Sequence, residues 1–235
     1  MLDIRPILFV LGALVIMLGL GMLIPFLADL AVGHADWKTF AISAFLSITL
    51  GGMFMLATQR TADQLSLKQA FIMTSSVWVI LPAFAALPFA FSELNLTFTD
   101  AYFEAMSGLT TTGSTVIAGL DTAPPGILLW RGLLQWLGGV GIVVMAVAIL
   151  PMLQIGGMQM FRMESSDTSE KILPRTAQIS FALAGFYLSL TAICALLLMV
   201  AGMPAFDAVI HSMTTIATGG FSTSDGSVGH FDSDK

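Results

Sequence analysis

Two short stretches rich in threonine and glycine are the part of this chain best suited to binding an ion. They read TTTGST over Thr110–Thr115 and ATGGFS over Ala217–Ser222, with no charged side chain in either. Uncharged carbonyl and hydroxyl oxygens can replace the hydration shell of a monovalent cation, whereas a divalent site would be expected to show carboxylates. Glycine tolerates the backbone conformations that let successive carbonyls point toward one path. The stretches therefore predict loops that line a path for a monovalent cation.

The two stretches belong to an internal repeat. With a shift of 107 residues, the segments 100–113 and 207–220 align with five identities, largely polar or glycine. The same shift pairs Lys68 with Arg175 upstream, at the entrances of two apolar runs. Internal repeats are a common plan of transporters. The identical pairs are Asp100 and Asp207, Ala101 and Ala208, Met106 and Met213, Thr111 and Thr218, and Gly113 and Gly220.

A short helix is predicted before each loop, too short to cross a bilayer at about 1.5 Å per residue. Asp100 and Asp207 stand at the N-terminal ends of these helices, where negative charge and capping are favourable. The C-terminal ends, which carry partial negative charge, then point toward the ion path. Non-helical backbone at membrane depth survives only if it is buried in protein or lines a watery cavity. We therefore expect both loops to line the same cavity.

The rest of the chain must hold these loops inside a membrane. Hydrophobic residues make up 56% of it and charged residues only 10%, against about a quarter in soluble domains. Five uncharged runs are long enough to span, since about 20 residues cross the hydrocarbon core. We expect the fourth helix to end at Pro151 and the fifth near Gly202. The runs are Pro6–Ala28, Thr39–Gln59, Gln69–Ser92, Gly132–Phe161 and Thr176–Phe206.

The basic residues predict that the N-terminus is cytoplasmic. The first run is longer than the roughly 7–15-residue core of a signal peptide, so it is interpreted as a retained helix. This orientation puts six of the nine basic residues inside, as the positive-inside rule requires. Both loops and most acidic residues then face outward, and the net charge of −6 favours cation attraction over nucleic-acid binding. The six inner residues are Arg5, Arg60, Lys68, Arg162, Lys171 and Arg175.

The motifs FEAMSGL–TTTGST (residues 103–115) and HSMTTIA–TGGFS (residues 211–222) resemble the first two pore loops of the Trk/Ktr/HKT superfamily of potassium transporters. The resemblance is to TrkH-like membrane subunits and covers the whole chain. It implies an all-α integral membrane fold of helix–pore-loop–helix repeats behind an N-terminal extra helix pair. The units would be the helix pair at 1–60, the first repeat at 61–167, and a second repeat at 168–235, truncated after its filter loop.

The resemblance also implies the site and the function. Each repeat contributes one filter glycine, in place of the GYG of tetrameric channels, and potassium is the transported ligand with no other cofactor. The function would be potassium uptake across the bacterial cytoplasmic (inner) membrane, with channel or symport left open. The implied partners are a second copy of the full-length protein and a cytoplasmic nucleotide-binding regulatory ring, not nucleic acid. The implied potassium ligands come from Thr111, Thr112, Gly113, Thr218, Gly219 and Gly220.

The chain departs from the family in carrying one complete repeat and most of a second, where members have four. It is therefore expected to be a fragment or a truncated reading frame. One alternative is a sodium-coupled or sodium-permeable member of the superfamily, against which Gly113 argues; another is a non-conducting fragment. An enzyme is not expected, because none of the five spans holds Asp, Glu or His in its helical core.

Four other features have a structural and a functional interpretation. The run at 138–141 (GGVG) is expected to serve close helix packing, since it lacks the spacing of a nucleotide-binding fingerprint. Arg131 is expected to snorkel or to pair with a carboxylate rather than guard the pathway. Glu104 and His211, at equivalent positions of the repeats, are expected to form hydrogen bonds behind the filter rather than tune protonation. The Gly156–Glu170 loop is either a contact for a regulatory subunit or a bare connector.

Overall fold

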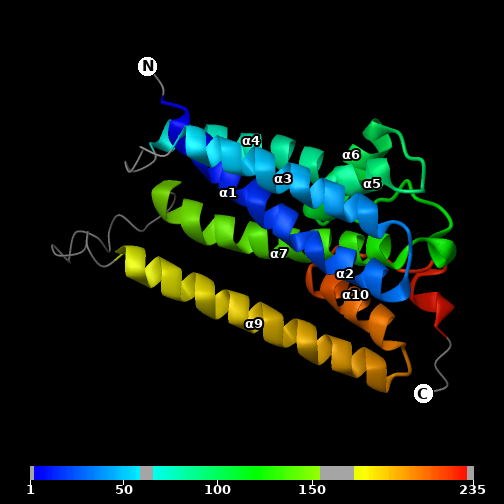
Figure 1. Ribbon diagram of the computed structural model, residues 1–235. Helices are drawn as coiled ribbons and strands as arrows, with labels where there is room; N and C mark the ends of the chain where they lie inside the picture. Colours follow the sequence, from blue (N-terminus) through cyan, green and yellow to red (C-terminus); the bar gives the residue numbers. More distant parts are fainter. Residues whose placement is uncertain (1–2, 59–65, 154–171, 232–235) are drawn as a thin grey trace.

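A computed structural model describes residues 3–58, 66–153 and 172–231, and within them the regular secondary structure is all helix, with no strands. Long helices lie side by side, and short ones gather at one end (Figure 1). The α-helices are α1 (Arg5–Gly21), α2 (Leu23–Val32), α3 (Trp37–Ala57), α4 (Leu67–Ala85), α5 (Leu87–Phe91), α6 (Phe98–Leu109), α7 (Pro125–Leu153), α9 (Ile172–Val200) and α10 (Ala205–Ile216). Two 3-10 turns complete the list, η1 (Leu120–Thr122) and η2 (Ser227–His230).

Four stretches of the described residues are helical, long and apolar enough to cross a membrane. They match the first, second, third and fifth predicted runs. The fourth run falls on α7, which is 29 residues long and ends two residues past Pro151, while residues 154–161 of that run lie outside the described part. The four stretches are Arg5–Val32, Trp37–Ala57, Lys68–Phe91 and Phe181–Val200.

Two of the predicted spans are interrupted by prolines. The first run is split between α1 and α2 at Met22, and the third between α4 and α5 at Ala86. Pro25 and Pro88 each stand in the first turn of the second piece. A proline has no N–H to donate, and its ring collides with the carbonyl four residues earlier, so the helix breaks there. Each span is thus two helical pieces rather than one.

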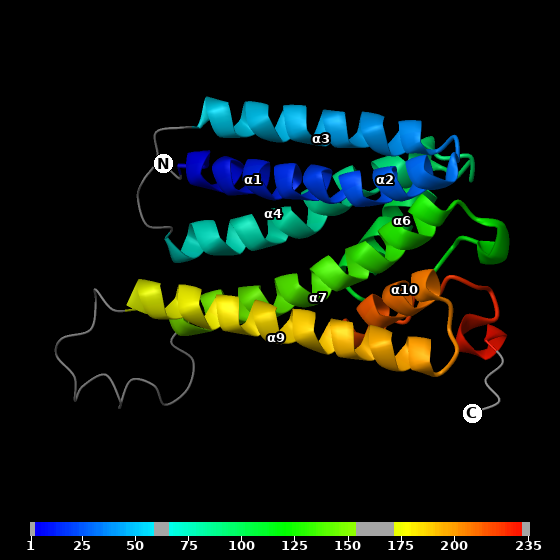
Figure 2. The same cartoon turned by 60° about the horizontal axis from the view of Figure 1, so that its bottom comes forward.

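The N-terminal helices form a tightly packed pair. A Cβ added to Gly12 of α1 would meet the carbonyl oxygen of Gly51 at 2.6 Å, and one added to Gly51 of α3 would meet that of Gly12 at 2.7 Å. Such reciprocal close contact of small residues is the usual way in which membrane helices associate. Figure 2 shows the two helices lying alongside each other over their length. The pair corresponds to the N-terminal extra helix pair.

Helix α7 runs through the middle of the molecule and supports both short helices (Figure 2). Its residue Trp130 is fully buried, and the indole nitrogen donates a hydrogen bond to the carbonyl of Ala85 at 3.0 Å. At the start of α7, the buried carboxylate of Asp29 accepts the N–H of Gly126 at 2.6 Å, a favourable place for negative charge. The ends of α6 and α10 are therefore fixed against a well-anchored helix.

The glycine-rich run of α7 confirms the packing interpretation. A Cβ on Gly138 would collide with the Leu109 carbonyl at the end of α6, and one on Gly139 would meet Ala217, just after α10, at 3.2 Å. A Cβ on Gly141 would meet nothing within 4 Å. Gly138 and Gly139 therefore let both short helices approach the α7 backbone closely.

Some predictions lie outside the described residues. They include the two domain boundaries, at 60/61 and 167/168, and the Gly156–Glu170 loop. The basic residues Arg60, Arg162 and Lys171 lie there as well. These remain predictions.

Candidate cation filter

The short helices α6 and α10 deliver the two loops. They span Phe98–Leu109 and Ala205–Ile216, so their bounds differ by 107 residues at both ends. As predicted, Asp100 and Asp207 lie in their first turns. Thr97 caps α6 by accepting the N–H of Asp100 at 3.2 Å, and the Asp207 carboxylate accepts the hydroxyl of Thr223 at 2.6 Å. The C-terminal end of each helix leads directly into a loop, which puts its partial negative charge there.

The two loops have the same backbone conformation. The φ angles are 54° at Thr111 and 56° at Thr218, and 81° at both Gly113 and Gly220. The backbone hydrogen bonds agree as well. The N–H of Thr112 donates to the carbonyl oxygen of Ser107 at 2.9 Å, and the N–H of Gly219 donates to the carbonyl oxygen of Thr214 at 2.8 Å. The repeat found in the sequence is therefore a repeat of backbone geometry.

Thr111 and Thr218 adopt the left-handed conformation, which is uncommon for residues other than glycine and unfavourable for β-branched ones. A conformation of this kind costs on the order of 1–3 kcal/mol and persists only where the surroundings impose it. Such residues cluster at ligand-binding sites. Their presence at matching positions of two loops points to a function that needs this backbone shape.

The loops touch each other at the predicted filter residues. A Cβ on Gly113 would collide with the carbonyl oxygen of Gly219, so this oxygen lies against the Gly113 backbone. Gly219 is buried, whereas Thr112, Thr218 and Gly220 are exposed. The fold thus joins residues of both loops at one place, although they are about a hundred residues apart in the chain.

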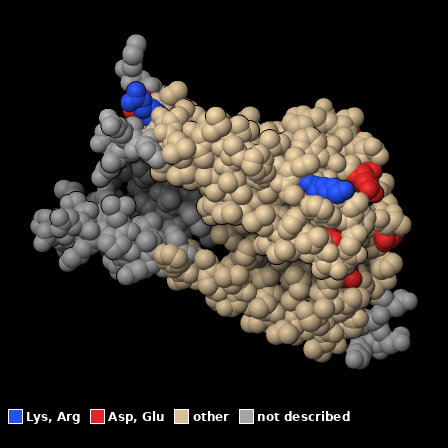
Figure 3. All heavy atoms as spheres, in the orientation of Figure 1, with Lys and Arg blue, Asp and Glu red and all other residues tan. Residues whose placement is uncertain are grey.

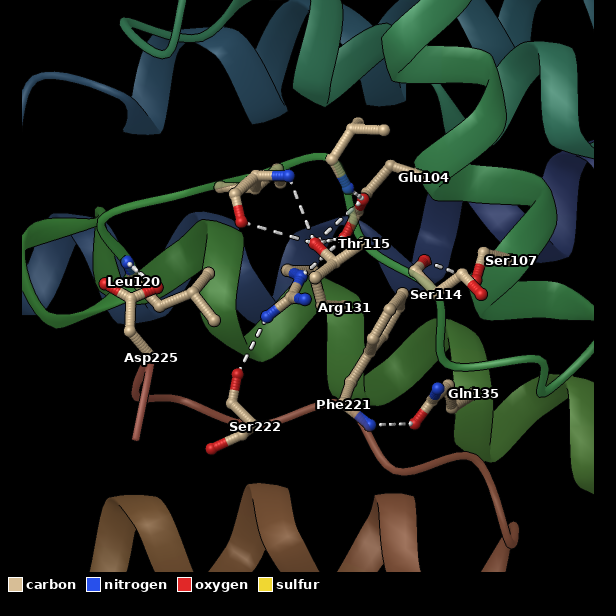
Figure 4. A network of polar contacts seen from close by, with 12 residues as sticks. Glu104, Ser107, Ser114, Thr115, Leu120, Arg131, Gln135, Phe221, Ser222 and Asp225 are labelled. Carbon is tan, nitrogen blue, oxygen red and sulfur yellow. Dashed lines mark hydrogen bonds and ion pairs between the residues drawn. The ribbon is translucent and has the colours of Figure 1, made fainter. Parts of the chain in front are cut away.

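A buried ion pair holds the first loop from behind. Arg131 of α7 and Glu104 of α6 pair at 2.8 Å, with side chains that are 1% and 0% exposed (Figure 4). The Glu104 carboxylate also accepts the hydroxyl of Thr115 at 2.9 Å and the N–H of Val116 at 3.0 Å. The expectation that Arg131 pairs with a carboxylate and that Glu104 bonds behind the filter is confirmed.

The same arginine holds the second loop. Arg131 donates to the carbonyl oxygen of Ser222 at 2.7 Å, and its guanidinium stands over the ring of Phe221, 4.1 Å from the centroid. A second link joins the loops directly, because the N–H of Leu120 donates to the Asp225 carboxylate at 3.2 Å. Figure 4 shows both loops converging on Arg131 from opposite sides. Arg131 and the hydrogen bond between Leu120 and Asp225 therefore fix the two loops relative to each other.

His211 takes the place of Glu104 in the second unit. One ring nitrogen, Nε2, lies 3.1 Å from the hydroxyl of Ser222, which corresponds to the contact between Glu104 and Thr115. The other, Nδ1, lies 2.8 Å from the carbonyl of Asp207, which can only accept, so Nδ1 carries a hydrogen; in the neutral ring Nε2 then accepts the Ser222 hydroxyl. The predicted hydrogen bonds behind the filter are present in this unit too.

Sequence reasoning missed Gln135. This residue lies one turn after Arg131 on α7, is fully buried, and its amide oxygen accepts the N–H of Phe221 at 3.1 Å. Its only signal in the sequence was a polar side chain in an otherwise apolar run, on the same helix face as Arg131.

The geometry defines a class of protein, a helical protein with membrane-spanning helices in which two short helices lead into two loops of matched backbone conformation. The family model described as "TrkH: Cation transport protein" matches residues 37–234. The chain therefore belongs to the TrkH family of cation transport proteins. This confirms the predicted superfamily and fold class, and the family is one of transport proteins rather than enzymes.

Several characterised proteins are similar to the chain. It is 46% identical over 232 residues to the Trk system potassium uptake protein TrkH of Salmonella typhimurium, covering 97% of this chain and 48% of that protein. The corresponding identity to TrkG of Escherichia coli is 37%, with the same coverage. The crystal structure of the potassium transporter TrkH from Vibrio parahaemolyticus superposes with a TM-score of 0.87 at 41% identity, over 99% of this chain and 47% of that one. The chain thus spans about half the length of the curated relatives it matches.

Proposed function

We propose that this chain supplies two of the filter loops of a potassium uptake pathway. The observation that carries the proposal is the matched backbone of the loops, with φ of 81° at both Gly113 and Gly220 and direct contact between Gly113 and Gly219. The relatives are named potassium uptake proteins, which supports potassium as the transported ion. The proposed ligands are carbonyl and hydroxyl oxygens of Thr111, Thr112, Gly113, Thr218, Gly219 and Gly220.

The chemistry of such a filter is substitution of hydration by fixed oxygens. The ends of α6 and α10 direct partial negative charge toward the loops, which favours a cation without a full charge that would trap it. The positive charge of Arg131 is neutralised by Glu104, so this buried arginine adds little electrostatic repulsion against a cation at the loops. Selectivity then depends on how rigidly the loop carbonyls are held.

The proposed setting is the bacterial cytoplasmic membrane, with the N-terminus inside and the loops near the outer face. Figure 3 shows acidic side chains, with a basic one beside them, gathered at the end of the molecule where Figure 1 draws the connection between α2 and α3. Arg5 is the first residue of α1 and Lys68 the second residue of α4, at the opposite end. This separation supports the orientation that the positive-inside rule predicts.

The proposed partners are a second copy of the full-length protein and a cytoplasmic nucleotide-binding ring, as the family resemblance implies. Co-purification of the full-length protein with a soluble ring protein would support the second. A full-length protein that stays monomeric and gates normally without a partner would contradict both.

The test of function is a chimaera in which residues 1–234 replace the matching segment of TrkH from Vibrio parahaemolyticus. It is expressed in cells that lack potassium uptake, and rubidium uptake is measured with potassium or sodium as competitor. We expect growth at low potassium and uptake that potassium inhibits far more strongly than sodium. Equal competition by sodium would favour the sodium-permeable alternative, and no uptake by a chimaera that reaches the membrane would contradict the proposal.

A further inference from the structure

The amide of Gln135 has an unusual position, because it is buried between the two loops and only half of it is hydrogen-bonded. Its oxygen accepts the N–H of Phe221 at 3.1 Å (Figure 4). Its nitrogen, Nε2, has no hydrogen-bond partner among the residues that the structure describes, although the side chain is 0% exposed. This nitrogen lies 3.8 Å from where a Cβ on Gly113 would stand. Leaving a buried donor without a hydrogen bond is costly, so an apolar side chain would suit this position better if its role were packing alone.

The same amide explains why the second loop has a glycine where the first has a threonine. Gly219 corresponds to Thr112 in the repeat, and its φ is not in the left-handed region. It is therefore not glycine for its backbone conformation. A Cβ at this position would instead collide with the Gln135 amide, reaching Nε2 at 2.6 Å. A side chain at position 219 would therefore need the buried Gln135 amide to move.

The contact bears directly on the filter, because the carbonyl oxygen of Gly219 is the one that lies against Gly113. Gln135 thus holds the second loop at two sites on either side of Gly220, by packing on Gly219 and by accepting the N–H of Phe221. It does so from α7, which also carries the Arg131 that joins both loops.

We propose that Gln135 is a positioning residue of the filter, which sets where the Gly219 carbonyl stands relative to Gly113 and so contributes to cation selectivity. This inference rests on the proposed function. The residue acts through the loop backbone rather than by touching the ion.

Four variants separate the two contacts. Gln135→Met keeps the length of the side chain and removes the acceptor for Phe221. Gln135→Ala also opens the space beside Gly219, Gly219→Ala fills that space, and the double variant Gln135→Ala/Gly219→Ala restores the fit. The matched control is Thr112→Ala, at the equivalent position of the first loop, combined with Gln135→Ala.

The first readout is thermal unfolding of the purified chain in detergent, without potassium. A loss of about 1 kcal/mol in the free energy of unfolding lowers the unfolding midpoint by roughly 2–4 °C for a chain of this size. We expect Gly219→Ala to lower the midpoint by at least that much, and the double variant to recover most of the loss. The effects of Thr112→Ala and Gln135→Ala on the unfolding midpoint should be additive. Additive effects of Gln135→Ala and Gly219→Ala would overturn the proposed contact.

The second readout is sodium competition against rubidium uptake by the chimaera. We expect Gln135→Met to raise the potency of sodium by roughly tenfold, the factor that corresponds to one lost buried hydrogen bond. If the effects of Gln135→Ala and Gly219→Ala on unfolding are non-additive but sodium competition is unchanged, Gln135 is only a packing residue and the proposal is overturned. If the unsubstituted chimaera takes up no rubidium, the proposed function fails while the unfolding cycle still tests the contact, so the two failures are distinguishable.

Discussion

At the scale of single residues, Arg131 is the buried charge that joins both loops. It pairs with Glu104 behind the first loop and donates to Ser222 in the second, at 1% exposure. Two buried charges cost several kcal/mol each to desolvate, and their attraction offsets that cost only with good geometry and further hydrogen bonds. Those bonds are the ones that hold the loops.

Removing one partner of this pair should be worse than removing both. We expect Arg131→Met to destabilise the fold by about 3–5 kcal/mol, because Glu104 is left as an uncompensated buried charge. The double variant Arg131→Met/Glu104→Gln should recover part of that loss, since the neutral amide keeps an acceptor for Thr115 and Val116. Unfolding midpoints in detergent measure both. A double variant less stable than Arg131→Met would contradict this account of the pair.

Gly220 isolates the effect of backbone conformation, because a Cβ there would meet nothing within 4 Å while φ is 81°. Gly220→Ala should therefore destabilise the loop conformation by about 1–2 kcal/mol, through backbone strain alone. Gly220→Asn should cost less, because asparagine tolerates the left-handed region better. Sodium competition in the chimaera should follow the same order. Equal behaviour of the two variants would contradict backbone strain as the cause.

At the scale of elements, α7 is the common support of both short helices. A Cβ on Gly138 would collide with backbone at the end of α6, whereas one on Gly139 would meet the Tyr187 hydroxyl at 2.5 Å and Ala217, the residue after α10, at 3.2 Å. The small residues position the loops by letting three helices approach closely.

A comparison within α7 tests this role. Gly138→Ala introduces a methyl group against the Leu109 carbonyl and should destabilise the fold by about 1–3 kcal/mol, as overpacking usually does. Gly141→Ala, in the same helix but with open space, is the control and should be neutral or slightly stabilising. The measurement is again unfolding in detergent. Equal midpoints for the two variants would refute close packing at Gly138.

The elements were predictable from sequence to the extent that local signals determine them. Long uncharged runs predicted the spanning helices, and the repeat predicted two equivalent loops, because both depend on residue type and spacing. The breaks at Met22 and Ala86 were not predicted, although Pro25 and Pro88 signal them. The role of Gln135 was not predictable, since it depends on contact with Phe221, 86 residues away.

At the scale of the whole molecule, orientation in the membrane can be tested with cysteines at the two ends of the α4–α5 span. Lys68 and Glu93 are both exposed. In a Cys194→Ser background, which removes the single native cysteine, Glu93→Cys should react with a membrane-impermeant maleimide in intact cells and Lys68→Cys only after permeabilisation. The reverse pattern would invert the proposed topology.

The central claim is that the paired glycine loops select potassium, and Gly113 tests it most directly. Gly113→Ala adds strain at φ 81° and a collision with the Gly219 carbonyl, whereas Gly141→Ala does neither. The measurement is rubidium uptake by the chimaera at increasing sodium. We predict that Gly141→Ala behaves like the unsubstituted chimaera and that sodium competes at least about tenfold more strongly in Gly113→Ala, as expected for a loss of about 1.4 kcal/mol in discrimination. Unchanged sodium competition in a Gly113→Ala chimaera that still takes up rubidium would contradict the account.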